Sequence, residues 1–574
     1  MITLHRKAAF AAGFLASVLA VGVAGAESAP EPETIAVGST VEPADQSATH
    51  SPGDESLRIE LAQKYNPASA EQRFYESRGY LPVWLSEDGS TTQATQALIS
   101  WAGAADANAL PVDRYGVSDL VTRLERAASG TLRDAAALEV ALTRLFLTYG
   151  RDISSGLLEP RDINRNIDVR PRRPDPAVLL AGIGATEDVA GFLDALVPAH
   201  PDYERLVAQY AQMREIAQNG DWGPQIAKGN TLQPDDRSPR VEELRARLIA
   251  MGDLLPDEKI AASDVINDAT PRTTDPQFFD PALEAAVRRF QARHGLNMDG
   301  AVGPMTLGAI NTSAAERTEQ IAVNLERMRW LNYDLGARHI FINTAGFTMS
   351  MIENGATRFS TRAVVGKAGK FQTPEFNDQL EYIVVNPSWN VPYSIASREI
   401  LPLLQEDPTY LEKNNMELLG SELPASQIDW SQVTRRNFPG RIRQRPGLDN
   451  ALGTVKFLFP NEYSIYMHDT PSRKLFARDR RDFSHGCVRL EDPTGFAELL
   501  LSLQDDDPVG TFERLRGQVG ERWVTIEEQI PVYLTYRTTW IDAVGVRNFR
   551  TDVYERDRDV IAALIAVGVS VISN

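Results

Sequence analysis

The chain has 574 residues, a formal net charge of −19 and a single cysteine, Cys487. A chain of this length can bury more than one hydrophobic core, so we expect several domains. The acidic balance argues against nucleic acid as a partner, because neutralising phosphates requires a basic face. One cysteine can form no internal disulfide, which leaves either a buried thiol or a reactive one.

The first 26 residues have the pattern of a secretory signal. Basic residues at positions 5–7 precede an apolar run over residues 8–23, and the small-residue triplet Ala24-Gly25-Ala26 follows directly. The alternative is an uncleaved anchor, since the run is only slightly shorter than the roughly 18 residues that a spanning helix needs. We predict a signal peptide over 1–26 and export, with association with the inner membrane if the signal is not cleaved.

Two regions of different composition follow the signal. Residues 27–55 are rich in Pro, Ser, Thr, Ala and acidic residues, which predicts a disordered linker. Residues 56–235 carry apolar side chains at steps of three and four, which indicates helices with one buried stripe. One such stripe is Tyr203, Leu206, Tyr210 and Met213. We interpret 56–235 as a helical scaffold domain.

Residues 238–312 read as a compact unit of three short helices. Asp280 and Pro281 supply an N-cap and a first-turn proline, and Gly295 is placed to end that helix. Gly300 and Gly303 then turn the chain into another short helix near Pro304.

From residue 336 the pattern changes from helical steps to alternation, which predicts strands. Asn354-Gly355 marks a tight hairpin, and sequential strands with short turns favour a mainly antiparallel β domain over 336–515. A helical insertion interrupts these strands. The tail, 516–574, is expected to form a hairpin and a helix packed on the body. The predicted fold class is therefore multi-domain α+β.

The stretch Ser484-His485-Gly486-Cys487 carries the strongest chemical signal. A thiol becomes a nucleophile when a nearby base accepts its proton, and His468 and His485 are both near in sequence. Gly486 permits a turn from which the amides of Gly486 and Cys487 could bind a developing oxyanion. Spacing alone does not decide which histidine is the base.

Two other interpretations of this stretch compete with a reactive thiol. Cys487 could fill a core while both histidines make structural hydrogen bonds, but thiol, base and glycine coincide as an activated nucleophile requires. A metal site of His468, His485 and Cys487 lacks the usual ligand spacing, and we expect neither a metal nor a cofactor.

Two resemblances fit these motifs. The first motif consists of Phe290, Gln291, Gly295, Leu296, "DGAVG", Thr306 and Leu307. It resembles the three-helix peptidoglycan-binding module. The second, "YMHDTPSRKLFARDRRDFSHGCVRL", resembles the L,D-transpeptidase (YkuD-like) catalytic domain. "FYESRGYLPVW" is similar to the helical scaffold of the large Gram-negative periplasmic members, so the resemblance covers nearly the whole chain and implies a periplasmic location.

The resemblance implies roles for individual residues. Cys487 is then the nucleophile and His468 its general base, oriented by the backbone carbonyl of Asp469. His485 is an auxiliary group near the oxyanion site. The insertion over about 393–445 corresponds to the lid, or capping subdomain, of those relatives.

Substrate contacts are assigned to Arg489, Ser484, Trp389 and Tyr393. Arg489 could bind a substrate carboxylate or form a structural salt bridge, and we hold both open. The lid also concentrates arginines in an acidic protein, which suggests steering of carboxylate-rich substrate, although such runs are most often a solvated face. These arginines are Arg435, Arg436, Arg441, Arg443 and Arg445.

The implied reaction is acyl transfer on peptidoglycan stem peptides. Cys487 would attack the carbonyl of the third stem residue, expel D-alanine, and pass the acyl group to an amine of a second stem, giving a 3→3 cross-link. If the protein is instead an L,D-carboxypeptidase or another cysteine hydrolase, water takes the place of the acceptor amine. A third hypothesis is a non-catalytic scaffold that binds the cell wall. Other cell-wall synthesis enzymes stay open as partners.

Overall fold

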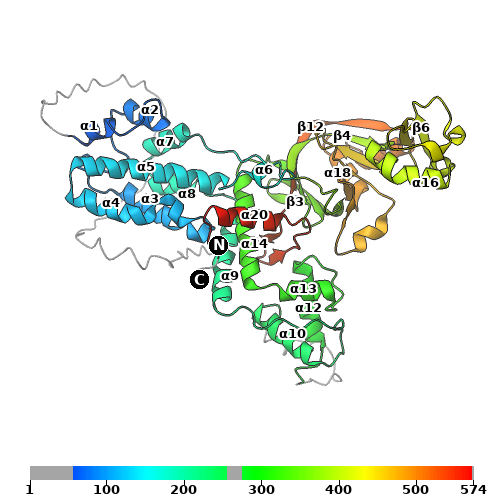
Figure 1. The fold of residues 1–574 in the computed structure, drawn as a ribbon, viewed down its shortest axis with the longest axis horizontal. Coiled ribbons are helices and arrows are strands. Elements are labelled where there is room, and N and C mark those ends of the chain that lie inside the picture. The colour runs from blue at the N-terminus through cyan, green and yellow to red at the C-terminus, as the bar shows by residue number, and fades with distance from the viewer. Residues whose placement is uncertain (1–55, 255–274, 572–574) are drawn as a thin grey trace. The chain divides into compact units, whose positions relative to one another are not determined.

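The computed structural model describes residues 56–254 and 275–571, so the predicted signal peptide and linker lie outside the described residues. The described part combines helices with one large and two small sheets, which is an α+β fold (Figure 1). None of its helices has both the length and the apolar character needed to cross a membrane.

The first region is helical, as predicted. Its longest helix, α5, buries one face, and the predicted stripe on α9 is buried at all four positions. Figure 1 shows these helices in blue and cyan. The elements are α1 (Leu57–Ala62), α2 (Ala70–Ser77), α3 (Gln93–Gly103), η1 (Asp106–Asn108), η2 (Val112–Tyr115), α4 (Val117–Ser129), α5 (Leu132–Ser155), α6 (Pro160–Ile163), α7 (Pro176–Ala185), α8 (Val189–Asp194) and α9 (Pro201–Gln218).

Two distant helices share the scaffold core. Helix α14 (Ala314–Trp330) contributes Ile321 and Trp330 to that core, and α20 (Arg556–Ala566) contributes Val560 and Leu564. A buried contact between Arg327 and Asp557 joins these two helices. The C-terminal end of the chain is therefore part of the core rather than an appendage.

The second region forms three helices around its own core: α10 (Pro239–Ala250), α12 (Pro281–Arg293) and α13 (Pro304–Asn311). The Asp280 carboxylate accepts the Leu283 amide at 2.9 Å, which confirms the predicted N-cap. Gly295, with φ of +67°, follows α12 as expected. Gln291 is 1% exposed and bonds to Asp299, so much of the motif serves the turn after α12.

The third region is a sheet whose two ends meet. Its strand order is β10-β3-β11-β9-β8-β4-β12-β1-β2, and a further pairing of β2 with β3 closes it. Most pairs are antiparallel, as predicted, and β1–β12, β10–β3 and β11–β9 are parallel. The strands are β1 (Arg338–Asn343), β2 (Thr348–Glu353), β3 (Ala356–Gly366), β4 (Phe376–Val385), β8 (Val455–Leu458), β9 (Met467–His468), β10 (Asp482–Ser484), β11 (Val488–Leu490) and β12 (Arg522–Thr535).

One feature of the tail differs from the expectation. Strand β12 lies inside the sheet between β4 and β1, whereas 516–574 was expected only to pack on the body. Its last residues are buried, since they face the core on both sides. The expected hairpin forms further on, and the remaining elements are η6 (Arg473–Ala477), α18 (Pro493–Leu501), α19 (Pro508–Arg516), β13 (Thr539–Ile541) and β14 (Arg547–Phe549).

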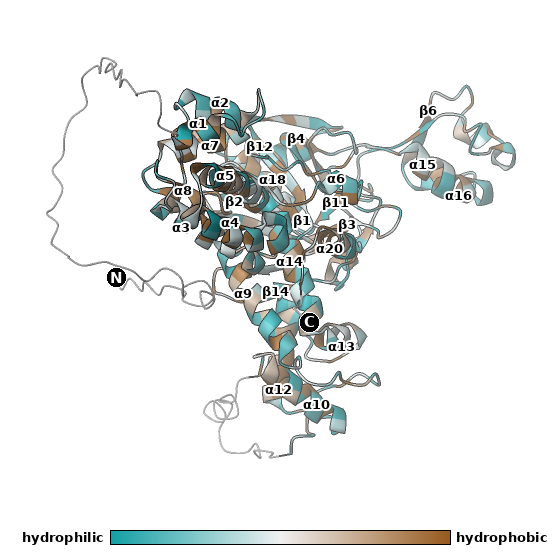
Figure 2. Ribbon diagram, turned by 60° about the vertical axis from the view of Figure 1, so that its left-hand side comes forward, coloured by the Kyte–Doolittle hydropathy of each residue, from teal (hydrophilic) through white to brown (hydrophobic). Residues whose placement is uncertain are grey.

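The insertion after β4 has a core of its own around Val391, Leu404, Trp430 and Ile442. It contains a three-stranded sheet, β5-β7-β6, so the expected helical lid is a mixed unit. Apolar side chains from its strands and helices, such as Ile442 and Leu404, pack together because neither layer could bury them alone. The elements are β5 (Trp389–Asn390), α15 (Tyr393–Ile395), η3 (Ala396–Ile400), α16 (Leu401–Glu406), α17 (Tyr410–Lys413), β6 (Met416–Leu419), η4 (Ala425–Gln427), η5 (Trp430–Gln432) and β7 (Arg441–Gln444). Figure 2 colours the elements of this unit, among them α15, α16 and β6, by hydropathy and shows both hydrophilic and hydrophobic residues in them.

Candidate active site

Strands β9 and β11 bring the candidate residues together. They pair in parallel, with Arg489 opposite His468, and the Val488 amide donates to the Tyr466 carbonyl at 3.0 Å. Side chains alternate between the faces of a strand, so Cys487 and Arg489 share one face with Tyr466 and His468. Thiol, imidazole, phenol and guanidinium therefore meet at one side of the sheet.

Cys487 is partly buried at this point. Burial raises the pKa of its thiol to about 11, although contacts with Tyr466 and the charge of Arg489 oppose that shift. The Sγ atom lies 3.8 Å from the Ser464 carbonyl oxygen. In the resting site the sulfur is therefore a neutral thiol, not the thiolate that an ion pair with histidine would give.

His468 is 4% exposed and held in one orientation. Its Nδ1 lies 2.5 Å from the Asp469 carbonyl oxygen, which confirms the predicted contact. Since a carbonyl only accepts, Nδ1 carries the proton and Nε2 is left as the basic nitrogen. Burial, with the Arg489 charge as the second cause, lowers the pKa of His468 to about 3, so its imidazole is neutral at pH 7.

His485 faces a different neighbour. Its Nε2 lies 2.8 Å from Oε1 of Glu399, in the π-helical turn η3 of the insertion, and its ring packs edge-on against Phe371 at 4.6 Å. The two histidines are thus distinguished: His468 shares the face of Cys487, and His485 reaches the insertion. Among the described residues no group of three or more His, Cys, Asp or Glu side chains is placed to hold a metal ion.

Ser484 and Gly486 shape the loop that carries Cys487. Gly486 has φ of +124°, and a Cβ there would lie 2.9 Å from Ile465 Cδ1. Its amide donates to Ser484 Oγ at 3.1 Å, and the same hydroxyl donates to the Cys487 carbonyl at 2.5 Å. The Gly486 amide is thus bonded to Ser484, and the buried Ser484 side chain bonds within the loop, while the oxyanion and substrate contacts expected of these two residues stay predictions.

Sequence reasoning missed the residues behind this loop. Thr373 Oγ1 donates to the Gly486 carbonyl at 2.7 Å and accepts the Gly366 amide at 2.9 Å. Arg556, the first residue of α20, donates to the Thr373 carbonyl at 2.7 Å and pairs with Glu375 at 2.9 Å. No local pattern signals such contacts, because they join positions that are far apart in the chain.

Arg489 has no carboxylate partner among the described residues. Its Nε is buried without a hydrogen bond, and burial lowers its pKa while the neighbouring Cys487 opposes the shift. Both alternatives for Arg489, a substrate contact and a structural salt bridge, therefore stay predictions.

The remaining predicted contacts lie in the insertion. Trp389 begins β5, and the exposed Tyr393 donates its hydroxyl to the Arg435 carbonyl. Neither residue has a recorded contact with Cys487. Of the five arginines, Arg443 and Arg445 pair with Glu417, while the other three are exposed.

Comparison with known proteins identifies the parts of the chain. Residues 337–524 match the family model described as "L,D-transpeptidase catalytic domain", 237–310 match "Putative peptidoglycan binding domain", and 69–209 match "Scaffold domain". The chain therefore contains an L,D-transpeptidase catalytic domain, preceded by a scaffold domain and a peptidoglycan-binding domain. The exact domain limits stay a prediction.

Parts of the chain are similar to individual known proteins. The "Putative L,D-transpeptidase" of Haemophilus influenzae is 33% identical over 250 residues, which are 42% of this chain and 49% of that protein. The "N-acetylmuramoyl-L-alanine amidase CwlM" of Mycobacterium tuberculosis is 36% identical over 91 residues, 16% of this chain and 21% of that protein. The chain thus matches about half, or less, of the length of these curated relatives. A crystal structure of the L,D-transpeptidase from Xylanimonas cellulosilytica is 15% identical and covers 55% of this chain and 98% of its own, with a TM-score of 0.16.

Proposed function

We propose that the protein is a peptidoglycan L,D-transpeptidase that forms 3→3 cross-links through a thioester on Cys487. The observation that carries the proposal is the β9–β11 register, which sets His468, oriented by the Asp469 carbonyl, on the face of the only thiol. A nucleophile, a neighbouring base and a group that orients the base are the parts that covalent acyl transfer needs.

The first half-reaction acylates the sulfur. His468 Nε2 takes the thiol proton as Sγ attacks the carbonyl of the third stem residue, because the resting thiol is neutral and proton transfer must accompany attack. The C–N bond to D-alanine breaks, His468 returns the proton to the leaving amine, and the acyl group stays on Cys487. The Cys487 amide is the remaining loop donor for the oxyanion, since Gly486 is bonded to Ser484.

The second half-reaction transfers the acyl group. A side-chain amine of another stem attacks the thioester, loses a proton to His468, and the thiol is regenerated. Arg489 is the proposed binder of a substrate carboxylate, and the insertion over about 393–445, with Trp389 and Tyr393, is proposed to cover the thioester and slow its hydrolysis. The peptidoglycan-binding domain would hold the wall polymer, and the expected export places the enzyme in the periplasm.

Product analysis tests this function. The full chain incubated with disaccharide-tetrapeptide should give, by mass spectrometry, a dimer lacking one D-alanine, and Cys487→Ser should abolish it. A product of tripeptide alone would select the carboxypeptidase. Unchanged turnover in Cys487→Ser would overturn the proposal for both activities.

A further inference from the structure

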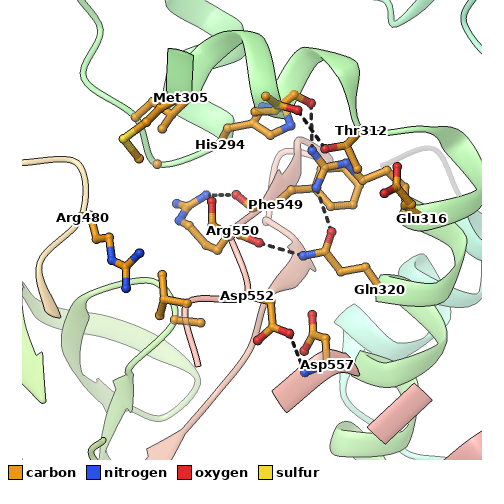
Figure 3. A pocket seen from close by; sticks show the side chains of 18 of the residues that line it. His294, Met305, Thr312, Glu316, Gln320, Arg480, Phe549, Arg550, Asp552 and Asp557 are labelled. Carbon is orange, nitrogen blue, oxygen red and sulfur yellow. Dashed lines mark hydrogen bonds between the residues drawn. The ribbon is translucent and has the colours of Figure 1, made fainter. Parts of the chain in front are cut away.

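The loop that carries Cys487 is supported from the start of α20. Asp552 accepts the backbone amides of Arg556 and Asp557, at 2.9 Å each, and so fixes the first turn of that helix. Figure 3 shows Asp552 and Asp557 together at the edge of a cavity of about 700 Å³, whose lining residues do not include Cys487. Arg556 reaches the loop through Thr373. A second loop, which contacts the thiol itself, has a different support.

This second loop, residues 461–466, leads into β9 and touches the sulfur. The Ser464 carbonyl oxygen is 3.8 Å from Cys487 Sγ. Tyr466 hydrogen-bonds to the same sulfur through its backbone and its side chain, and both contacts lower the pKa of the thiol because they favour the ionised form. The loop thus offers an acceptor to the thiol and donors to the thiolate that forms during attack.

Ser464 holds an unfavourable backbone conformation. Its φ is +55°, in the left-handed region that residues other than glycine rarely adopt. Such a conformation persists only when the surrounding structure holds it. Part of the hold is local, because the Asn461 side chain accepts the amides of Tyr463 and Ile465 and donates to the Phe459 and Ile465 carbonyls. These contacts all lie within residues 459–465.

Tyr463 joins this loop to the scaffold domain. Its hydroxyl donates to Asp168 Oδ2 at 2.6 Å, a distance typical of a hydrogen bond to an ionised carboxylate. Its ring packs on Phe376 with 5.0 Å between centroids. Asp168 lies within residues 69–209, which match the scaffold family model, and it is 9% exposed. A buried carboxylate of the scaffold domain is therefore bonded to the loop beside the thiol.

Asp168 is itself held on two sides. Its amide donates to the Glu375 carbonyl, and the Glu375 amide donates to the Asn166 carbonyl, both at 2.8 Å. Residues 166–168 therefore pair in parallel with the chain just before β4. On the other side, Arg161 Nε lies 3.0 Å from Asp168 Oδ1. A carboxylate fixed in this way can hold Tyr463 in turn.

We propose that Asp168 is a positioning residue for the Cys487 thiol, contributed by the scaffold domain. Through the Tyr463 hydroxyl it holds residues 461–466 in the conformation that sets the Ser464 carbonyl and the donors of Tyr466 around the sulfur. The scaffold domain thereby takes part in setting the reactivity of the thiol. This inference rests on the proposed function only in taking Cys487 as the nucleophile.

Removing the Tyr463 hydroxyl tests the link. In the full chain, Tyr463→Phe should let the loop relax and admit water and reagent to the sulfur, so that iodoacetamide alkylates Cys487 several-fold faster at pH 8. For the stem peptide, kcat should fall by about tenfold with little change in KM, because the sulfur is no longer held for attack. Both are measured well below the melting temperature of each variant.

Tyr75 provides a matched control within the scaffold domain. Its hydroxyl donates to Glu139 Oε1 at 2.8 Å, so Tyr75→Phe also removes a buried bond between a tyrosine and a carboxylate, and it should leave alkylation and kcat unchanged. Rates in Tyr463→Phe that equal those of the parent would overturn the proposal. Equal acceleration of alkylation in Tyr75→Phe would do the same, because a general loss of stability would then explain the effect.

Variants of Asp168 separate its two contacts. Asp168→Ala should match Tyr463→Phe, and the double variant should be no worse than either, because both changes remove the same bond. Asp168→Asn keeps an oxygen that can accept from Tyr463 but loses the charge that pairs with Arg161, and it should retain most of kcat. Additive losses in the double variant, or equal losses in Asp168→Asn and Asp168→Ala, would show that Asp168 does not act through Tyr463.

Failure of the proposed function is a separate result. Alkylation of Cys487 requires no stem peptide, so its rate reports on the loop whether or not a cross-linked product forms. Absent product in the parent chain with the expected alkylation rates would reject the transpeptidase and keep the role of Asp168.

Discussion

At the residue scale, burial acts in opposite directions on the two groups that would exchange a proton. It raises the pKa of Cys487 to about 11 and lowers the pKa of His468 to about 3. Both shifts favour the neutral forms, because a partly dry site penalises charge. Cys487 is therefore an unreactive thiol in the resting site. Attack becomes favourable only when bound substrate stabilises the charges that form on the sulfur and the imidazole.

The pH dependence of alkylation follows from this. Only the thiolate reacts with iodoacetamide, so the rate for the single cysteine should keep rising with pH and reach half of its maximum near pH 11. A cysteine in an unfolded peptide, with a pKa of about 8.5, is the control. A rate that is already maximal at pH 7 would mean that Cys487 and His468 form an ion pair at rest.

Thr373 is the second residue whose effect can be measured. Thr373→Val keeps the shape but removes the hydroxyl that bonds to Gly486 and Gly366, which should cost about 1–3 kcal/mol of unfolding free energy. Because the loop positions Cys487, kcat should fall more than KM rises. Thr373→Ser keeps the hydroxyl and should restore most of kcat; equal losses in both variants would show that the hydroxyl does not position the loop.

At the element scale, the insertion is attached to the nucleophile loop at one polar point. Among the described residues, and apart from bonds to the flanking residues 446–451, the hydrogen bond from His485 to Glu399 is the only side-chain bond between residues 391–445 and the sheet domain. Glu399, which accepts this hydrogen bond, lies in the π-helical turn η3. Such turns often occur at functional positions. The side chains of His485 and Glu399 are both partly exposed, so the contact between them is weak and can break and re-form.

Removing this tie should open the insertion. Glu399→Ala is expected to raise the KM for the stem peptide and to speed alkylation of Cys487 several-fold, as the insertion spends more time away from the thiol. Glu412→Ala, an exposed carboxylate on α17 of the same unit, is the control. If Glu399→Ala leaves both the KM and the alkylation rate unchanged, the insertion does not depend on this contact.

At the scale of the whole molecule, the C-terminal segment connects the helical core to the active-site loop. Helix α20 shares the scaffold core through Val560 and Leu564, and its first residue, Arg556, pairs with Glu375 and bonds to Thr373. Arg556 is thus hydrogen-bonded to Thr373, which in turn bonds to the loop that carries Cys487.

Breaking the buried Arg556–Glu375 pair should be costly. Arg556→Met leaves Glu375 buried without its cation and is expected to lower the unfolding free energy by about 3–5 kcal/mol. Adding Glu375→Gln removes the unpaired charge and should recover part of that loss, measured by urea denaturation. A double variant that is less stable than the single one would show that the charge of Glu375 is satisfied by another group.

The local sequence was sufficient to predict several elements. Asn354 and Gly355 both have positive φ and join β2 to β3, and Asp280 caps α12, since turns and caps depend on neighbouring residues alone. The Ser-His-Gly-Cys string likewise predicted the loop of the proposed nucleophile, because the thiol and one histidine are neighbours in the sequence. The Arg489 alternatives and the roles of Ser484 and Gly486 could not be settled in this way.

What the sequence by itself determined was the set of domains, the position of the thiol and the two histidines available to it. Only the tertiary structure decided which histidine shares the face of Cys487, where β12 enters the sheet, and that Thr373, Glu375 and Arg556 support the loop. The physical reason is distance along the chain: caps, turns and periodicity act within a few residues. Register, burial and the shifts in pKa that follow from burial are set by segments that meet only in the folded protein.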